Sequence, residues 1–138
     1  MPRSAKPAAH SAHRSNCPIS SALDLLGDRW TLLVVRDILF AGARRFGDFL
    51  KSAEGIPTNI LAERLARLER IGVVRRVPYQ KRPVRYEYRL TGCGADLLPV
   101  LMALSQWSDR HIPGRLRPGR AAYEAALKVV AEAKKSGC

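Results

Sequence analysis

The hydrophobic period changes once, sharply, between Gly55 and Thr91, and this change limits the possible folds more than any other feature of the chain. The first half of the segment carries leucine and isoleucine at steps of four, three and three residues, the spacing of one face of an α-helix. Pro57 suits a first helical turn, and Gly72 suits the position after the last turn, where a left-handed backbone is required. We therefore predict a helix of about 14 residues that begins near Pro57. Its buried face would consist of Leu61, Leu65, Leu68 and Ile71.

After Gly72, apolar and charged residues alternate, as in a β-strand with one buried face. The alternation runs from Val84 to Leu90, and the basic, β-branched run 73–77 would form the partner strand. The connecting segment 78–83 holds two prolines and no apolar run, so we expect a loop with a basic tip. A helix followed directly by a two-stranded ribbon is the arrangement of a winged helix-turn-helix, in which the helix enters the DNA major groove and the ribbon lies along the backbone.

The charge of the chain favours a polyanionic partner. Its 138 residues include 24 Lys or Arg and 12 Asp or Glu, a net charge of +12, and the segment 57–91 carries half of that net charge. A basic helix can also be a solvated surface and a hairpin can be purely structural, but this concentration of charge favours nucleic-acid binding. No apolar run approaches the roughly 18 residues of a membrane span, so we expect a cytoplasmic, nucleoid-associated protein with no membrane partner.

Three further helices are predicted before this segment. Pro18 can begin a short helix that ends at Gly27, Asp28 can cap a second helix that is too apolar for a surface, and residues 44–50 would form a third. The third would be the first helix of the helix-turn-helix. Basic side chains and helix N–H groups at its start together suit a phosphate.

Two more helices are predicted after the hairpin. Residues 97–107 place apolar side chains nearly all round a helix, which must be covered on more than one side. One side can pack on its own domain and the other on a second subunit; the alternative is a fully internal helix in a monomer. The last helix would carry Tyr123, Leu127 and Val130 on one stripe, and either docks on the dimer or remains mobile.

The predicted fold class is therefore mainly α with a small antiparallel β-hairpin (α+β), a dimeric winged helix-turn-helix. The predicted organisation has three parts. Residues 1–16 would form a disordered basic arm, residues 17–112 the winged helix-turn-helix domain with its dimerisation helices, and residues 113–138 a linker and a helical tail.

Four sequence blocks together resemble the HxlR family of bacterial transcription regulators, which are relatives of the MarR group. The blocks read CPISSALDLLGDRWTLLVVRDIL, RRFGDFL, GIPTNILAERLARLERIGVVRR and RYEYRLT. The resemblance covers about two-thirds of the chain and leaves the N-terminal arm and the segment after Gly114 unaccounted for. It implies a homodimeric winged-helix DNA-binding protein, with dimer contacts from the first and last helices and sequence readout from the helix that begins near Pro57.

Two sets of residues follow as candidates. On the readout helix, Asn59 could pair with adenine and Glu63 could accept from cytosine, while Arg64 sits near the buried flank and would brace the wing. Basic side chains of the helix and the wing would hold phosphates, or the minor groove at the wing tip. The candidate DNA-binding residues are Arg44, Arg45, Thr58, Asn59, Ala62, Glu63, Arg67, Arg70, Lys81, Arg82 and Arg85. The candidate dimerisation residues are Ile19, Leu23, Leu26, Leu97, Leu101, Leu104 and Trp107.

Cys17 is the candidate redox sensor. It lies at the start of the first helix, where N–H groups favour a thiolate, and that helix belongs to the expected dimer interface. The resemblance adds that some HxlR regulators sense oxidants or electrophiles through a cysteine at this place. The alternative is that Cys17 is a small buried residue before a proline. With Cys93 and Cys138, the chain has three cysteines, which lack the even count and the density of a disulfide framework.

Other chemistries find little support in the sequence. The run 92–97, Gly-Cys-Gly-Ala-Asp-Leu, lacks the third glycine of a dinucleotide-binding loop. His10, His13 and Cys17 have spacings that a metal could use, but they lie in a Ser/Ala-rich arm. We therefore expect no metal, no cofactor and no enzymatic activity. Two alternatives to a sequence-specific regulator remain: a sequence-independent architectural DNA-binding protein, and a winged helix that serves only for protein interaction.

Overall fold

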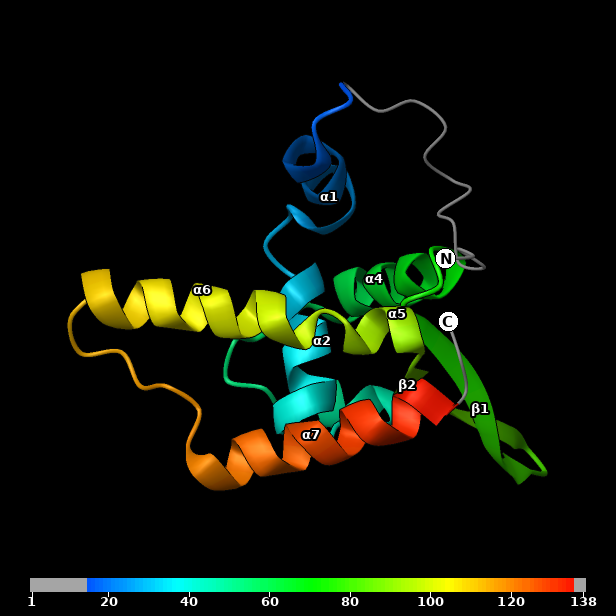
Figure 1. The fold of residues 1–138 in the computed structure, drawn as a ribbon. Helices are drawn as coiled ribbons and strands as arrows, with labels where there is room; N and C mark the ends of the chain where they lie inside the picture. Colours follow the sequence, from blue (N-terminus) through cyan, green and yellow to red (C-terminus); the bar gives the residue numbers. More distant parts are fainter. Residues whose placement is uncertain (1–14, 136–138) are drawn as a thin grey trace.

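The computed structural model describes residues 15–135, so the expected basic arm falls almost entirely outside the described residues. The described part is mainly helical and contains one antiparallel sheet of two strands (Figure 1), as the sequence predicts. Its elements are α1 (Pro18–Leu26), α2 (Thr31–Phe40), α3 (Phe46–Leu50), α4 (Thr58–Arg70), β1 (Val74–Lys81), β2 (Val84–Leu90), α5 (Gly92–Ala95), α6 (Leu98–His111) and α7 (Arg120–Lys135).

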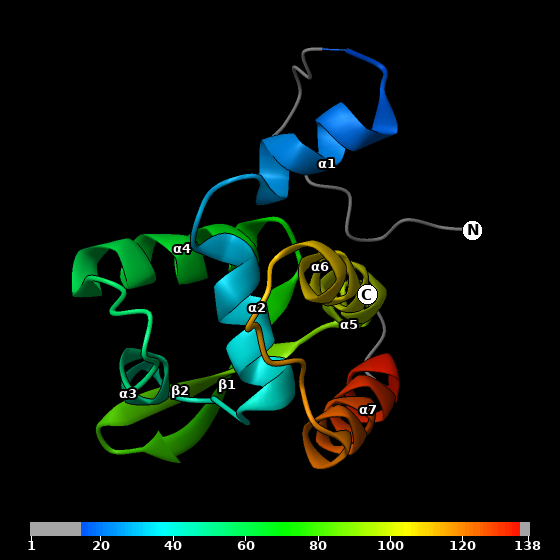
Figure 2. The same ribbon diagram turned by 90° about the vertical axis from the view of Figure 1, so that its left-hand side faces the viewer.

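Helix α2 is the centre of the fold. It lies between α4 on one side and α6 and α7 on the other (Figure 2). Val35 and Ile38 on this helix are fully buried, so its predicted place in the core is confirmed. The N-cap of α2 is Trp30 and not the predicted Asp28, so the helix begins later than expected. The Asp28 carboxylate still accepts from the N–H groups of Trp30 at 2.9 Å and Thr31 at 3.1 Å and so satisfies backbone donors at the start of the helix.

Helix α4 has nearly the predicted boundaries. Pro57 is its N-cap, one position before the expected first turn, and Gly72 follows its end with a left-handed φ of 82°. Leu61, Leu65 and Leu68 are buried in the core that α4 shares with α2. Burying one leucine side chain stabilises a fold by about 1.5–3 kcal/mol, so this face ties α4 firmly to the rest of the domain.

The hairpin that forms the wing is longer than predicted. Strand β1 continues through Pro78, so the connection is far shorter than the expected loop over residues 78–83. A register shift makes this possible: Pro78 pairs with Tyr86 and Gln80 with Arg85, which leaves Tyr79 as the extra residue of a bulge. A bulge bends a strand and re-aims its side chains without ending the pairing.

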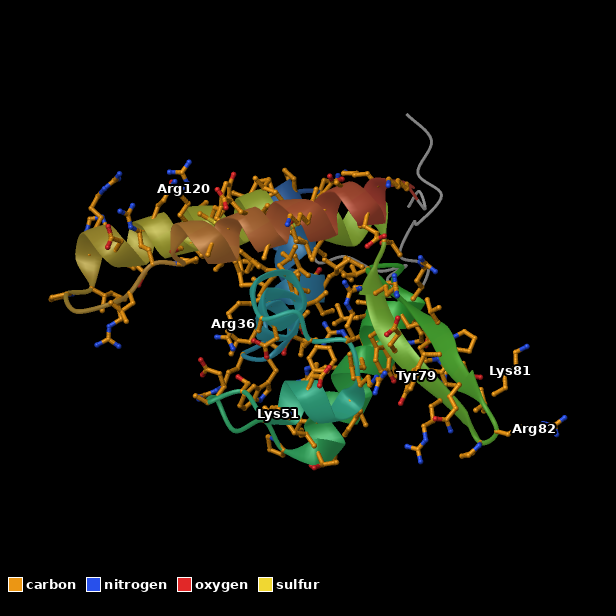
Figure 3. All side chains as sticks on the ribbon, turned by 90° about the horizontal axis from the view of Figure 1, so that it is seen from below. Arg36, Lys51, Tyr79, Lys81, Arg82 and Arg120 are labelled. Carbon is orange, nitrogen blue, oxygen red and sulfur yellow. The ribbon has the colours of Figure 1, made fainter. Side chains whose placement is uncertain are left out.

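Only the base of the hairpin belongs to the core. Val74 and Leu90 pair across the two strands and are both buried, whereas Val84 and Tyr86 in the outer half are exposed. The tip of the ribbon runs out past the helices (Figure 3), and the side of its outer half that faces α3 lines an open groove, so Val84 and Tyr86 stay exposed to solvent. The expected apolar face of the second strand is therefore confirmed only at its inner end.

Helix α1 has the predicted boundaries but stands away from the rest of the domain (Figures 1 and 2). None of its residues is buried, and Ile19 and Leu23 are 71% and 54% exposed. Leu25 is half-buried and packs against the core. Because packing of an apolar face supplies most of the stability of a short helix, α1 gains little from its own chain.

Helix α7 packs on α2 and α5 and completes the core on that side. Its buried residues are Ala126 and Ala133, whereas on the predicted stripe Val130 packs half-buried against the core and Tyr123 and Leu127 are exposed. Small residues occupy the contact because α5 is a glycine-rich turn that brings its backbone close to α7. Only side chains without long branches fit between two backbones at such an approach.

Candidate nucleic-acid interface

Helices α3 and α4 form the predicted helix-turn-helix pair, and one carboxylate fixes the start of α3. Asp48 accepts from the backbone N–H groups of Arg44 and Arg45, each at 3.0 Å. These bonds hold the pKa of Asp48 below its usual value. Asp48 thus uses the N–H groups of Arg44 and Arg45, whose side chains stay available to a phosphate.

The outward face of α4 is polar and open to solvent. Thr58, Asn59, Ala62 and Glu63 in its first two turns and Arg70 in its last turn are all exposed. Asn59, Glu63 and Arg70 lie on the side opposite the buried leucines, as the helical period predicts. A polar helix face of this kind can approach base edges in a major groove.

The flank of α4 faces the junction between α1 and α2. Nε of Arg64 donates to the Asp28 carboxylate at 2.8 Å, and Nη1 of Arg67 lies 3.7 Å from the other oxygen of that carboxylate. Burial disfavours the charged form of Asp28, but hydrogen bonds from Thr31, Arg64 and the backbone outweigh it and hold the pKa of Asp28 well below its usual range. Arg64 therefore braces the start of α2 and not the wing, which corrects the sequence-based expectation.

Arg67 also binds α1 directly. Its Nη2 donates to the carbonyl oxygens of Asp24 at 3.1 Å and Leu25 at 2.9 Å. These carbonyls belong to the last turn of α1, where no helical N–H group is available to them. The structure thus turns this candidate DNA-binding residue towards α1. Sequence analysis missed the link because a helical period shows which flank a side chain occupies and gives no information on what lies beside that flank.

The wing tip presents basic side chains to solvent. Lys81, Arg82 and Arg85 are exposed, and Figure 3 shows Lys81 and Arg82 projecting from the end of the ribbon. At the inner side of the ribbon, Cζ of Arg45 lies 3.9 Å from the centre of the Tyr79 ring, a cation–π contact that links the start of α3 to β1. The ring in this contact belongs to Tyr79, whose direction is set by the bulge.

A groove of about 470 Å³ lies between α3 and the wing. Its lining includes the basic side chains Arg45, Lys51 and Arg85 and the rings of Tyr79 and Tyr86. Cationic groups beside aromatic rings suit a sugar-phosphate backbone. The sequence does not point to Lys51 and Tyr79, because no local pattern shows that the wing folds back beside α3.

The candidate dimerisation residues fall into two groups. Leu26, Leu97 and Leu101 are half-buried, and the latter two pack against the domain's own core. Leu104 and Trp107 on α6 are 53% and 60% exposed, like the outward residues of α1. The second group therefore leaves large apolar side chains in water, which is unusual for a face without a partner.

Cys17 is the N-cap of α1, and it is exposed and free. The alternative of a small buried cysteine is therefore wrong. Cys93 takes part in a disulfide, which the sequence did not predict. Among residues 15–135, no group of His, Cys, Asp and Glu side chains has a geometry that could hold a metal, and His10 and His13 lie outside that range. No helix in the described part of the chain is both long and apolar enough to cross a bilayer.

The order of these elements defines the class of the protein. A helix-turn-helix made of α3 and α4 and followed at once by an antiparallel hairpin is a winged helix-turn-helix. The chain belongs to the HxlR-like helix-turn-helix family, whose model matches residues 25–115. The match includes every element from α2 to α6 and leaves out α7.

Similar proteins are named as transcriptional regulators and not as enzymes, in agreement with the sequence analysis. An uncharacterised helix-turn-helix regulator of Mycobacterium tuberculosis is 45% identical over 95 residues, which are 69% of this chain and 59% of the relative. The chain thus spans less than two-thirds of the length of this relative. The regulator YodB of Bacillus subtilis is 36% identical over 95 residues, 68% of this chain and 84% of YodB.

Two solved structures share the fold. The reduced form of YodB superposes with a TM-score of 0.58 at 33% identity and covers 74% of this chain and 100% of that one. The redox regulator HypR in its reduced form superposes with a TM-score of 0.62 at 28% identity and covers 70% of this chain and 95% of that one.

Proposed function

We propose that this protein is a transcriptional regulator that binds a palindromic operator in double-stranded DNA as a homodimer. The observation that carries the proposal is the exposed polar face of α4 beside a basic wing, in a chain of the HxlR-like family. In this arrangement Asn59 and Glu63 would meet base edges, while Lys81, Arg82 and Arg85 would hold phosphates. A protein that acts on the bacterial chromosome works in the cytoplasm.

A second copy of the chain would cover the apolar side chains that α1 and α6 leave in water. Each large side chain that such an interface buries contributes about 1.5–3 kcal/mol, and a two-fold interface buries every one of them twice. In such a dimer the two α4 helices would meet half-sites about one DNA turn, roughly 34 Å, apart. The exposed apolar face of α1 and α6 and the palindromic operator are thus linked by the same two-fold symmetry.

Selection of bound fragments from the source organism's genomic DNA tests this function. Fluorescence anisotropy then compares the recovered duplex with a scrambled duplex of the same composition, and sedimentation reports the oligomeric state. We expect a dimer that binds the recovered duplex at least about 1,000-fold more tightly than the scrambled one. Equal affinities would favour a sequence-independent architectural protein. Binding that is weak and insensitive to salt would favour a protein-interaction module.

We infer that oxidation or alkylation of Cys17 is the input to this regulator. The thiol is exposed at the start of α1, whose apolar face belongs to the proposed interface. The similar structures include HypR in its oxidised form and YodB treated with diamide, which supports an oxidant response in this chain. A modification at this position would change how the two copies meet.

Diamide titration tests this input. The affinity of the wild-type protein for the recovered duplex should change as the oxidant is added, and the affinity of Cys17→Ser should stay constant. A wild-type protein that responds in the same way as Cys17→Ser would exclude Cys17 as the sensor.

A further inference from the structure

Helix α4, the proposed recognition helix, binds α1, which the rest of the domain hardly covers. Helix α1 has no buried residue, yet Nη2 of Arg67 on α4 donates to the carbonyl oxygens of Asp24 and Leu25. The last-turn carbonyls form the negative end of the helix dipole, so a guanidinium there supplies both hydrogen bonds and an opposite charge. Arg67 thus acts as a C-terminal cap for α1 that comes from another helix.

The same arginine is tied to the start of α2. Asp28 accepts from N–H groups at the start of α2 and binds both Arg64 and Arg67, so the end of α1, the start of α2 and the middle of α4 meet at one ion cluster. We call these three residues the Asp28 cluster. Their side chains are only 22%, 19% and 20% exposed, so solvent screens their interactions less than it screens a surface pair. Charge-assisted hydrogen bonds in such a place are strong and directional.

We propose that Arg67 is a positioning residue, which fixes the angle between α1 and α4 and thereby sets the separation of the two recognition helices in the dimer. This inference rests on the proposed function, in which α1 lies at the dimer interface and α4 reads the operator. A two-fold axis applies any rotation of α4 relative to α1 to both copies, so a small change in this angle moves both recognition helices. The same bonds carry a displacement of α1, imposed by the partner or at Cys17, to α4.

A phosphate contact and a positioning contact have different consequences on DNA. Loss of a phosphate contact weakens binding to every duplex by a similar factor, because phosphates carry no sequence information. Loss of a positioning contact instead makes the separation of the two α4 helices less definite. The affinity should then depend less on the spacing between half-sites.

Arg70 provides a matched control for Arg67. It lies one turn further along α4, carries the same charge, is exposed, and has no side-chain hydrogen bond within the described residues. Arg67→Ala and Arg70→Ala therefore remove the same charge from the same helix. Only the first of these substitutions removes a link to α1.

The experiment measures the affinity of wild type and variants for the recovered operator and for duplexes with one or two base pairs inserted or removed between its half-sites. Each base pair turns one half-site by about 35° around the duplex axis. We expect the wild type to lose at least about tenfold in affinity for a shift of one base pair, a penalty similar to that of a mismatched site. Arg67→Ala should lose less than about threefold, and Arg70→Ala should keep the wild-type profile at lower affinity throughout.

Arg67→Lys keeps the positive charge but lacks the planar fork that reaches two carbonyls and a carboxylate together. Its spacing profile should fall between those of wild type and Arg67→Ala. If circular dichroism shows that Arg67→Ala does not fold, Arg67→Lys alone tests the positioning role of Arg67. A wild-type spacing profile in the folded Arg67 variants would overturn the proposal.

Failure of the proposed function would look different. In that case the wild-type protein itself would sediment as a monomer or would bind all spacings equally, whatever the variants do, and the role of Arg67 would fall with it. A sharp wild-type profile that Arg67 variants leave unchanged would refute the positioning role alone.

Discussion

Gly94 is the position where the smallest substitution should have a large effect. A Cβ atom added there would lie 2.3 Å from the carbonyl oxygen of Val73 and 2.8 Å from Cδ2 of Leu90. The Val73 oxygen cannot move freely, because it accepts from the backbone N–H of Thr91 at 3.0 Å, and the Thr91 hydroxyl donates to the neighbouring carbonyl oxygen of Gly72 at 2.5 Å. The Thr91 hydroxyl in turn accepts from the N–H of Gly94 at 3.1 Å. Gly94→Ala therefore strains the hydrogen bonds at the base of the wing.

The expected cost follows from these contacts. Overpacking in a tight site costs about 1–3 kcal/mol. The one or two hydrogen bonds that are lost add about 0.5–1.5 kcal/mol each. The lower freedom of alanine in the unfolded chain offsets about 0.4–1 kcal/mol. The central values of these terms give a loss of about 3 kcal/mol in the free energy of unfolding.

Urea denaturation followed by circular dichroism measures this loss. Wild type and variants must be compared at one protein concentration, because the stability of a dimer depends on it. Gly47→Ala in α3 is the matched control, since its new Cβ meets no atom within 4 Å. We expect the control to be unchanged or more stable by up to about 1 kcal/mol. If Gly94→Ala is as stable as Gly47→Ala within about 0.5 kcal/mol, the close approach at Gly94 does not constrain the wing.

Three other expectations concern readout, assembly and pH. Asn59→Ala should cost about 1–3 kcal/mol of binding free energy on the selected operator and little on random DNA. Arg82→Ala should weaken binding to both DNAs and lower the slope of log affinity against log salt concentration by about 1. Equal losses on both DNAs for Asn59→Ala would exclude a readout role for this residue. Trp107→Ala and Leu104→Asp should shift sedimentation towards the monomer and weaken operator binding, and unaltered dimers would place the interface elsewhere. The depressed pKa of Asp28 means that its stabilisation is complete above the ordinary Asp range and is lost as the pH falls below about 4. The stability advantage of wild type over Asp28→Asn should therefore shrink in acid, and a constant difference from pH 7 to pH 2 would contradict this linkage.

Features that depend on neighbouring residues were predictable from the sequence. The buried leucines of α4 and the left-handed turn at Gly72 follow from helical period and backbone sterics, which act within a few residues. The same is true of the exposed face that carries Asn59, because the opposite side of an amphipathic helix must face out. The fold class and the candidate readout surface came from these local rules.

Features that depend on distant residues were not predictable in the same way. The stripe of large side chains on α7 gave no sign that Ala126 and Ala133 are the buried residues, because their burial depends on how closely α2 and α5 approach this helix. Pro78 suggested a loop, but a ribbon with two open edges tolerates a proline that a central strand would exclude. Arg67 turned to α1 because Asp28 and two open carbonyls lie beside it, and those partners are about 40 residues away in sequence.

The absence of buried residues in α1 has a consequence for how such regulators diversify. Most substitutions that impair proteins do so by destabilising a core, and the described residues of α1 contribute none of their side chains to the buried core. Sequence changes around Cys17 therefore carry little penalty for the folded monomer. Over generations, this end of the molecule can acquire or lose a reactive group while the DNA-reading half stays intact. A response to a new chemical signal can thus arise at α1 while the DNA-binding part of the protein stays unchanged.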